Sequence, residues 1–199
     1  MFGELRKRLD EAITYGCFEL ARELIQEGLR QAQERELLGE IEYFKGQKEI
    51  LNRNYYEAIK HFDQAVKFNP NDGAAFNDRA LCMVELGIID EALIYFDKGI
   101  EAEPDYATVY HNKGWLLNKI GQHREAIRYF RKALELESER AVTYENLADA
   151  LASLADYQEA LIAYQKAIDL LGPEYSDIKE QISNEMKSLE KKINRTQGE

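Results

Sequence analysis

A phrase of eleven residues occurs four times in this chain at a constant interval. It reads YEAIKHFDQAV, DEALIYFDKGI, REAIRYFRKAL and QEALIAYQKAI. Its third residue is an alanine in every copy, here called the anchor alanine, and successive copies are 34 residues apart: Ala58, Ala92, Ala126 and Ala160. A fixed period of about 20–50 residues indicates a solenoid, in which each repeat packs on its neighbours.

Each repeat has the pattern of two helices joined by a tight turn. Apolar residues recur at intervals of three and four, as they do on one face of an amphipathic helix. Helix-favouring residues dominate the chain, and no alternating apolar run bounded by turn residues predicts a strand. The sequence therefore predicts an all-α solenoid of antiparallel helix pairs, and we expect one solenoid domain over residues 1–199.

The predicted repeats span residues 2–38, 39–72, 73–106, 107–140 and 141–173, and a last helix follows over 174–195. The first repeat is degenerate. Its counterpart of the anchor alanine, Ala21, precedes Ala58 by 37 residues, so its second helix is expected to be longer than the others. The second repeat departs from the pattern because Glu42 and Lys45 stand where bulky apolar residues are expected.

Small and aromatic residues recur at fixed places in the repeats. The first helices carry Gly46, Ala80, Gly114 and Ala148, and the second helices carry Phe62, Phe96, Phe130 and Tyr164, four residues after each anchor alanine. Small side chains allow the two helices of a repeat to cross closely. We expect the aromatic rings to wedge into the next repeat.

The last helix has one apolar stripe on an otherwise charged surface: Ile178, Ile182, Met186, Leu189 and Ile193. The final repeat of a solenoid leaves an apolar face open, and a helix with a polar outer face closes it. We interpret this helix as a cap. The alternative is an amphipathic helix that pairs with a second copy or a partner. Residues 194–199 are expected to be a frayed tail.

The charge balance limits the class of partner. The formal net charge is −11 and the sequence pI is near 4.9, so the dense basic face that nucleic acid or an anionic membrane requires is not expected. The N-terminus lacks the pattern of a signal peptide, and no run reaches the length of a membrane span. The default location is the cytoplasm.

Residues suited to catalysis or metal binding do not form a recognisable motif. Cys17 and Cys82 are far apart and belong to no metal or redox pattern. The histidines His61, His111 and His123 fall on different elements, and the phosphate-loop pattern GxxxxGK[ST] does not occur. We expect no catalytic residues, no metal site, no cofactor and no enzymatic activity.

The repeat resembles the tetratricopeptide repeat, whose pattern is W-x2-L-G-x2-Y…A-x3-F…P over about 34 residues. Phe76, Ala80, Met83, Ala92, Phe96 and Pro104 follow it in one repeat, and Tyr110, Gly114, Leu117, Ala126 and Phe130 follow it in the next. The resemblance is strong over residues 39–173 and weak before them. It implies a right-handed superhelix whose first helices line a concave groove that takes an extended peptide or a partner helix. Such proteins act mostly as scaffolds, co-chaperones and assembly factors.

The resemblance also implies which residues face the groove. They are Tyr43, Gln47, Asn77, Asp78, Leu81, His111, Asn112, Trp115, Glu145, Asn146 and Asp149. Asp78, Asn112 and Asn146 repeat at 34-residue spacing and could hydrogen-bond the backbone of an extended peptide; alternatively, they solvate the first helices or tie neighbouring repeats together. Trp115 is either a binding hot spot or a ring packed between first helices.

One subset of the family grips the C-terminal carboxylate of chaperone tails with two Lys, one Arg and two Asn. Asn112 fits one Asn position. The basic positions are held by Asn77, Val142 and Asn146 in one register and by Tyr43, Thr108 and Asn112 in the other. Neither register supplies the cations for carboxylate capture. The acidic groove instead predicts a neutral to basic partner.

The sequence therefore predicts a non-catalytic protein-interaction module or scaffold, which binds an extended or helical segment of another protein in its groove. The alternative is a structural protein that forms homo-oligomers through its terminal helices. Its motivation is the degenerate first repeat and the amphipathic last helix.

Overall fold

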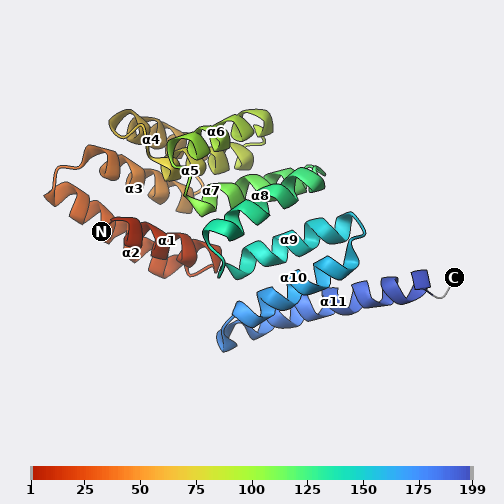
Figure 1. Ribbon diagram of the computed structural model, residues 1–199. Coiled ribbons are helices and arrows are strands. Elements are labelled where there is room, and N and C mark those ends of the chain that lie inside the picture. The colour runs from red at the N-terminus through yellow and green to blue at the C-terminus, as the bar shows by residue number, and fades with distance from the viewer. Residues whose placement is uncertain (1, 198–199) are drawn as a thin grey trace. The chain divides into compact units, whose positions relative to one another are not determined.

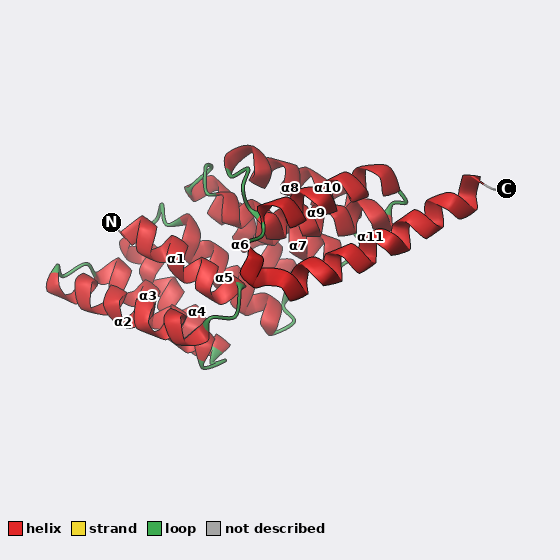
Figure 2. Ribbon diagram, turned by 90° about the horizontal axis from the view of Figure 1, so that it is seen from below, coloured by secondary structure: helices red, strands yellow, loops and turns green. Residues whose placement is uncertain are grey.

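The computed structural model describes residues 2–197, which form α-helices, one 3-10 helix and connecting loops (Figure 1). The helices are α1 (Phe2–Thr14), α2 (Phe18–Glu34), α3 (Leu38–Leu51), α4 (Tyr55–Phe68), α5 (Gly73–Glu85), α6 (Ile89–Ala102), α7 (Ala107–Lys119), α8 (His123–Leu136), α9 (Ala141–Ser153), α10 (Tyr157–Leu170), η1 (Pro173–Tyr175) and α11 (Ser176–Gln197). Figure 2 shows no strand in this part of the chain. The predicted all-α class is confirmed.

The helices group into two compact units, residues 1–104 and residues 105–199. In the N-terminal unit, α1 pairs with α2, α3 with α4 and α5 with α6, while α2 contacts α3 and α4 contacts α5. In the C-terminal unit, α7 pairs with α8 and α9 with α10, α8 contacts α9, and α11 packs on α10. Five helix pairs and a closing helix confirm the predicted number of repeats and the cap, whereas the bounds of the repeats and the single domain over 1–199 stay predictions.

The crossing of α3 with α4, and that of α7 with α8, depends on an aromatic ring that packs over a glycine. A Cβ atom added at Gly46 would lie 2.7 Å from the ring of Phe62, and one added at Gly114 would lie 2.9 Å from the ring of Phe130. Both rings are fully buried. Each ring thus packs on the first helix of its own repeat, whereas the sequence predicted a contact with the next repeat. Because glycine has no Cβ atom, the first helix leaves a space that faces the second helix of the same repeat, and the aromatic ring fills this space.

The off-pattern residues of the second repeat form a polar cluster on the outside of the pair α3/α4. The carboxylate of Glu42 accepts from Lys45 Nζ at 2.7 Å and lies 2.7 Å from His61 Nδ1. Tyr43 and Phe44 supply the apolar surface instead, since both are buried. The core of this repeat is therefore shifted along α3 by one to two positions.

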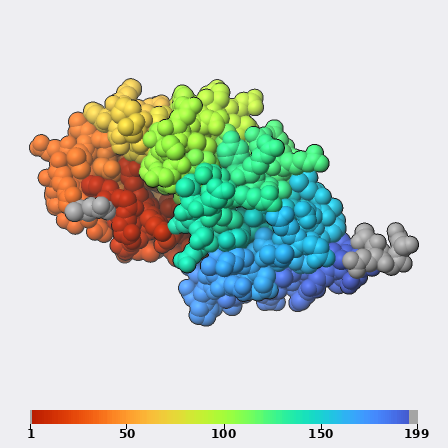
Figure 3. Space-filling model, viewed as in Figure 1, coloured from red at the N-terminus to blue at the C-terminus, as the bar shows by residue number. Residues whose placement is uncertain are grey.

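The last helix follows the predicted stripe. Ile182 and Leu189 are buried, and Ile178, Met186 and Ile193 are half-buried. The atoms of α10 and of the first part of α11 adjoin in the space-filling view (Figure 3). The helix continues to Gln197, so the frayed tail predicted over 194–199 is wrong for residues 194–197, and residues 198–199 lie outside the described range. None of the helices within residues 2–197 combines the length and apolarity needed to cross a membrane.

The turn inside each helix pair places one residue in the left-handed backbone region. Gly16, Gly87 and Gly121 have φ of 73°, 76° and 82°, and the equivalent residues Arg53 and Ala155 have φ of 59° and 62°. A left-handed conformation costs an L-residue about 1–2 kcal/mol, whereas glycine adopts it freely. Two of the five turns are therefore strained.

Replacing Ala155 with glycine is expected to raise the free energy of unfolding by about 0.5–1 kcal/mol, because it relieves this strain. Gly121→Ala, at the equivalent turn, is the matched control and should lower the same quantity by about 1 kcal/mol. Urea unfolding followed by circular dichroism measures both. A shift of the two variants in the same direction would contradict the left-handed turn.

Candidate functional site

Four predicted groove residues of the N-terminal unit form a buried hydrogen-bonded cluster between α3 and α5. Gln47 Nε2 donates to the hydroxyl oxygen of Tyr43 at 3.0 Å and also donates to Asp78. Asn77 Nδ2 donates to the other oxygen of Asp78 at 2.9 Å. Their exposed fractions are between 1% and 8%. The prediction that these four residues line an open groove is therefore wrong: the side chains bond to one another instead of facing solvent.

Arg6 of α1 reaches the same region. Its guanidinium donates to both carboxylate oxygens of Asp72 at 2.8 and 2.9 Å and to Glu40 at 3.2 Å. It also lies 3.6 Å from the centroid of the Tyr43 ring. Asp72 accepts from the backbone N–H of Ala75 at 3.0 Å and so caps the start of α5. The Arg6 side chain therefore covers this part of the predicted groove.

The charges of the cluster respond to burial and to each other. Burial is the largest single influence on Arg6 and opposes its charge, but the hydrogen bond to Asp72 and the electrostatic attraction of Tyr43, Asp72 and Glu40 together outweigh burial and raise the pKa of the guanidinium. Burial raises the pKa of Glu40, although Arg6 acts against it. Burial also raises the pKa of Asp78 from 3.8 to about 7; the Asp10 carboxylate adds to this rise and the hydrogen bond from Tyr43 opposes it. Asp78 thus titrates near neutral pH.

We expect the stability of the chain relative to an Asp78→Asn variant to fall as the pH rises from about 4 to about 7. In this window the unfolded chain has released the Asp78 proton while the folded chain still holds it, so each rise in pH favours the unfolded chain. Outside the window the difference between the two proteins should be constant. Urea unfolding of both proteins across the pH range measures it, and a flat difference would show that Asp78 titrates normally.

His111 of α7 is another predicted groove residue that the structure buries. Its Nδ1 lies 2.9 Å from the hydroxyl oxygen of Thr143, and its ring centroid lies 5.8 Å from that of Phe130. Burial lowers the pKa of His111 to about 3, so the imidazole is neutral at physiological pH. The prediction that His111 faces the groove is therefore wrong. Its side chain joins α7 to α9 and packs on the aromatic residue of its own repeat.

The remaining predicted residues are accessible. Leu81 of α5 is half-buried, as are Asn112, Trp115, Glu145 and Asn146 of α7 and α9, and Asp149 of α9 is exposed. Except for Leu81, all of them lie on the first helices of the C-terminal unit. The structure thus places five predicted site residues on two helices that contact each other.

These five residues combine amide, aromatic and acidic groups. The amide of Asn146 donates to the carbonyl of Val142 at 2.9 Å, which leaves its oxygen as an acceptor. Asp149 accepts from the hydroxyl of Tyr164. Although Asp149 is exposed as a whole residue, the desolvation of its carboxyl group raises its pKa, and burial followed by the neighbouring Asp149 charge raises the pKa of Glu145. A positive charge near these two carboxyl groups would stabilise their ionised forms, so this surface favours a cationic group of a partner.

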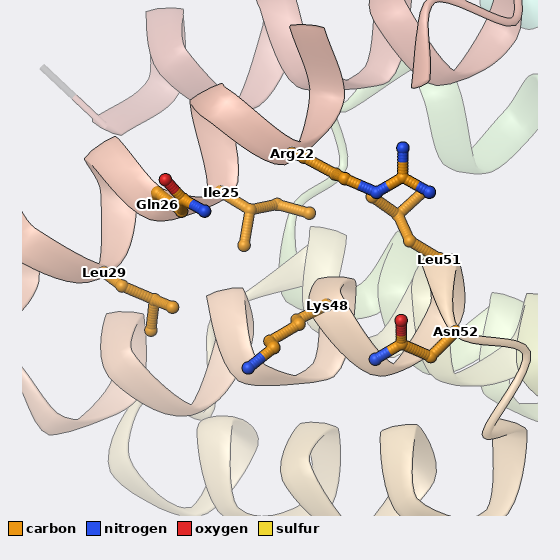
Figure 4. A pocket seen from close by; sticks show the side chains of 7 residues that line it. All are labelled: Arg22, Ile25, Gln26, Leu29, Lys48, Leu51 and Asn52. Atoms are coloured by element: carbon orange, nitrogen blue, oxygen red, sulfur yellow. The ribbon is translucent and has the colours of Figure 1, made fainter. Parts of the chain in front are cut away.

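A pocket that no sequence prediction named lies between α2 and α3. Its volume is about 160 Å³, and it is lined by Arg22, Ile25, Gln26, Leu29, Lys48, Leu51 and Asn52 (Figure 4). A comparison between the repeats could have predicted this pocket from the sequence. Arg22 and Lys48 occupy places where the other repeats carry apolar residues or cysteine.

Metal-binding groups are not gathered in the described part of the chain, where no cluster of three or more His, Cys, Asp or Glu could hold an ion. Both cysteines are free thiols: Cys17 is exposed and Cys82 is buried. Burial raises the pKa of the Cys82 thiol, so it stays protonated and unreactive.

Comparison with known families identifies the repeat. Family models described as tetratricopeptide repeat match residues 51–107, 107–139 and 141–170, which together make up more than half of the 199 residues. The chain belongs to the tetratricopeptide repeat family. Members of this family are typically non-catalytic protein-interaction modules, and the helix pairs described above are its structural unit.

Curated relatives of this tetratricopeptide repeat chain match over a short segment. Hsp70-Hsp90 organizing protein 3 of Arabidopsis thaliana is 41% identical over 54 residues, which are 27% of this chain and 10% of that protein. Hsp70-Hsp90 organizing protein of Triticum aestivum is 37% identical over 54 residues, 27% of this chain and 9% of that protein. The matched segment thus spans about a tenth of the length of these relatives.

Solved structures match over most of the chain and share its fold. TTC0263, a tetratricopeptide repeat protein of Thermus thermophilus, has a TM-score of 0.72 at 18% identity and covers 92% of this chain and 98% of its own. YrrB, described as having an unusual peptide-binding site, has a TM-score of 0.57 at 21% identity with 84% of each chain covered. The first repeat domain of Spaghetti, bound to the HSP90 peptide SRMEEVD, has a TM-score of 0.57 at 17% identity and covers 62% of this chain and 94% of its own.

Proposed function

We propose that this chain is a protein-binding module whose binding surface lies on α7 and α9. The surface consists of Asn112, Trp115, Glu145, Asn146 and Asp149. The observation that carries the proposal is the accessibility of these five residues, because five of the other six predicted groove residues are buried and bonded internally. The binding surface is thus narrower than the groove that the sequence predicts.

The chemistry of this surface favours a neutral to basic segment in an extended or helical conformation. The side-chain amides of Asn112 and Asn146 are of the type that bonds a peptide backbone without reading its sequence. Trp115 offers apolar area and one N–H donor, a combination common at binding hot spots. Glu145 and Asp149 supply the negative charge that attracts a lysine or arginine side chain.

An acidic chaperone tail fits this surface poorly. The HSP90 peptide bound by Spaghetti carries two glutamates, an aspartate and a C-terminal carboxylate. The equivalent positions of this chain lack the cations that carboxylate capture needs, and Glu145 and Asp149 would repel the peptide. The short match to the Hsp70-Hsp90 organizing proteins therefore supports protein binding in general, but it does not support binding of the same partners.

Selection of a random peptide library on the immobilised 199-residue chain tests the proposal. We expect the selected peptides to be neutral or basic. The triple variant Asn112→Ala/Trp115→Ala/Asn146→Ala should bind them at least about tenfold more weakly by calorimetry, with a nearly unchanged thermal melt. The matched control is Gln158→Ala/Ile162→Ala/Gln165→Ala, three exposed residues on α10 of the same unit, which should bind like the parent chain. Equal binding by the triple variant would exclude the α7/α9 surface.

The alternative of self-assembly through the terminal helices has less support. Leu5 and Leu9 of α1 and Ile182 and Leu189 of α11 are all buried within the chain. The apolar faces that motivate this alternative are therefore already covered. The absence of nucleic-acid and membrane partners stays a prediction that rests on the net charge of −11, and the cytoplasmic location also stays a prediction.

A further inference from the structure

The pocket between α2 and α3 combines an apolar floor with a basic rim. Ile25 and Leu29 of α2 and Leu51 of α3 supply the apolar surface. Arg22 and Lys48 stand on opposite sides, and the amides of Gln26 and Asn52 complete the lining (Figure 4). Both helices belong to the N-terminal unit and contact each other directly. This basic pocket is separate from the surface on α7 and α9.

Comparison between repeats shows that the basic rim is peculiar to this place. The residue after the anchor alanine is aliphatic in the other four repeats, namely Ile59, Leu93, Ile127 and Leu161, but it is Arg22 in the first. The counterparts of Lys48 in the next three repeats are Cys82, Leu116 and Ala150, all of them buried. Two positions of the repeat core thus carry cations here. Departures from a chain's own consistent pattern are expected at functional sites.

One residue in the floor of the pocket is smaller than its counterparts in the other repeats. The residue four places after the anchor alanine is Phe62, Phe96, Phe130 or Tyr164 in the other repeats, but it is Ile25 in the first. The pocket of about 160 Å³ compares with the cavity of about 150 Å³ that holds one benzene molecule in another protein. One leucine or phenylalanine side chain of a ligand therefore fits it.

We propose that the basic pocket docks one apolar side chain of a partner protein, from a segment in which acidic residues flank that side chain. The apolar side chain would contact Ile25, Leu29 and Leu51, and the flanking carboxylates would meet Arg22 and Lys48. Charge complementarity selects this occupant, since the pocket sets two cations at the mouth of an apolar hollow in a chain of net charge −11.

The cations of the rim are available for such a partner. Arg22 pairs with Glu19 at 2.5 Å, and both side chains are more than half exposed. Exposed pairs of this kind contribute little to stability, so a carboxylate of the partner can replace Glu19. A guanidinium can hold a carboxylate through two parallel hydrogen bonds, whereas a lysine acts as a point charge. Arg22 is thus the stronger of the two contacts.

Methyl NMR of the 199-residue chain tests the proposal with three blocked pentapeptides. The first has a central leucine between glutamates, the second replaces the glutamates with lysines, and the third replaces the leucine with serine. We expect only the first peptide to shift the methyl signals of Ile25, Leu29 and Leu51 in a saturable manner. Binding by the lysine peptide or equal binding by the serine peptide would overturn the proposal, because the charge or the apolar contact would then be irrelevant.

The double variant Arg22→Leu/Lys48→Leu places at both positions the kind of apolar residue that the other repeats carry, so it is expected to fold. It should bind the glutamate–leucine peptide about tenfold more weakly. The reversal Arg22→Glu/Lys48→Glu should instead bind the lysine–leucine peptide. An unchanged affinity in the first variant would overturn the proposal. Loss of binding at α7 and α9 would not affect this result, because those helices lie in the other unit.

Discussion

Replacing Phe130 with alanine is expected to lower the free energy of unfolding by about 3–5 kcal/mol. The ring is fully buried on the close approach of α7 to α8, where a Cβ atom at Gly114 would lie 2.9 Å from it. Removing the ring loses its transfer free energy and leaves a cavity that the crossing helices can hardly collapse, because a Cβ atom at Gly114 would already lie 3.2 Å from the carbonyl oxygen of Ala126. A fall of about 10 °C in Tm follows from an effect of this size.

Thermal and urea unfolding followed by circular dichroism measure this change. Phe68→Ala is the matched control, since Phe68 ends α4 with 53% of its surface exposed and should alter stability little. If Phe130→Ala melted with the parent chain, the packing of an aromatic ring on the small residue of its own repeat would be refuted.

Replacing Arg6 with alanine is expected to destabilise the N-terminal unit by about 3–5 kcal/mol. The side chains of Arg6 and Asp72 are only 15% and 3% exposed, and Glu40 is 20% exposed. Without the guanidinium, two carboxylates remain close together with little access to water. Removing one partner of a buried ion pair is far more harmful than the net contribution of the pair suggests.

The matched control is Arg30→Ala on α2. Arg30 pairs with Glu34 at 3.1 Å, but both side chains are about 60% exposed, so the loss should stay below about 1 kcal/mol. Urea unfolding of both variants separates the two cases. Equal stability of Arg6→Ala and Arg30→Ala would mean that water screens the Arg6 cluster as well as it screens a surface pair.

The helix pairs, their order and the closing helix could be predicted from the sequence because they depend on periodicity. A period of 34 residues places each anchor alanine, and the apolar stripe of α11 places Ile182 and Leu189 against α10. Even the longer second helix of the first repeat follows from the 37-residue offset of Ala21, since α2 has 17 residues and α4 has 14.

The exposure of the candidate site could be predicted only in part. Positions of the repeat tell which face of a helix a residue occupies, but they do not tell what covers that face. Tyr43 is covered by Arg6, which lies 37 residues earlier in the chain, and His111 is bonded to Thr143 of the next first helix. Such contacts depend on the individual side chains of two distant segments, and a periodic pattern carries no information about them.

The contact between Arg6 and Asp72 changes how the N-terminal unit can come apart. In an ideal repeat array each repeat touches only its neighbours, so the ends open first and opening proceeds one repeat at a time. Here Arg6, on the first helix of the first repeat, is ion-paired with Asp72, which lies 66 residues later. Asp72 also caps the first helix of the third repeat. The terminal repeat cannot detach without breaking the ion pair between Arg6 and Asp72, so opening of the first repeat is coupled to the third repeat as well as to the second. This ion pair between the first and third repeats therefore makes unfolding of the N-terminal unit more cooperative than contacts between neighbouring repeats alone would.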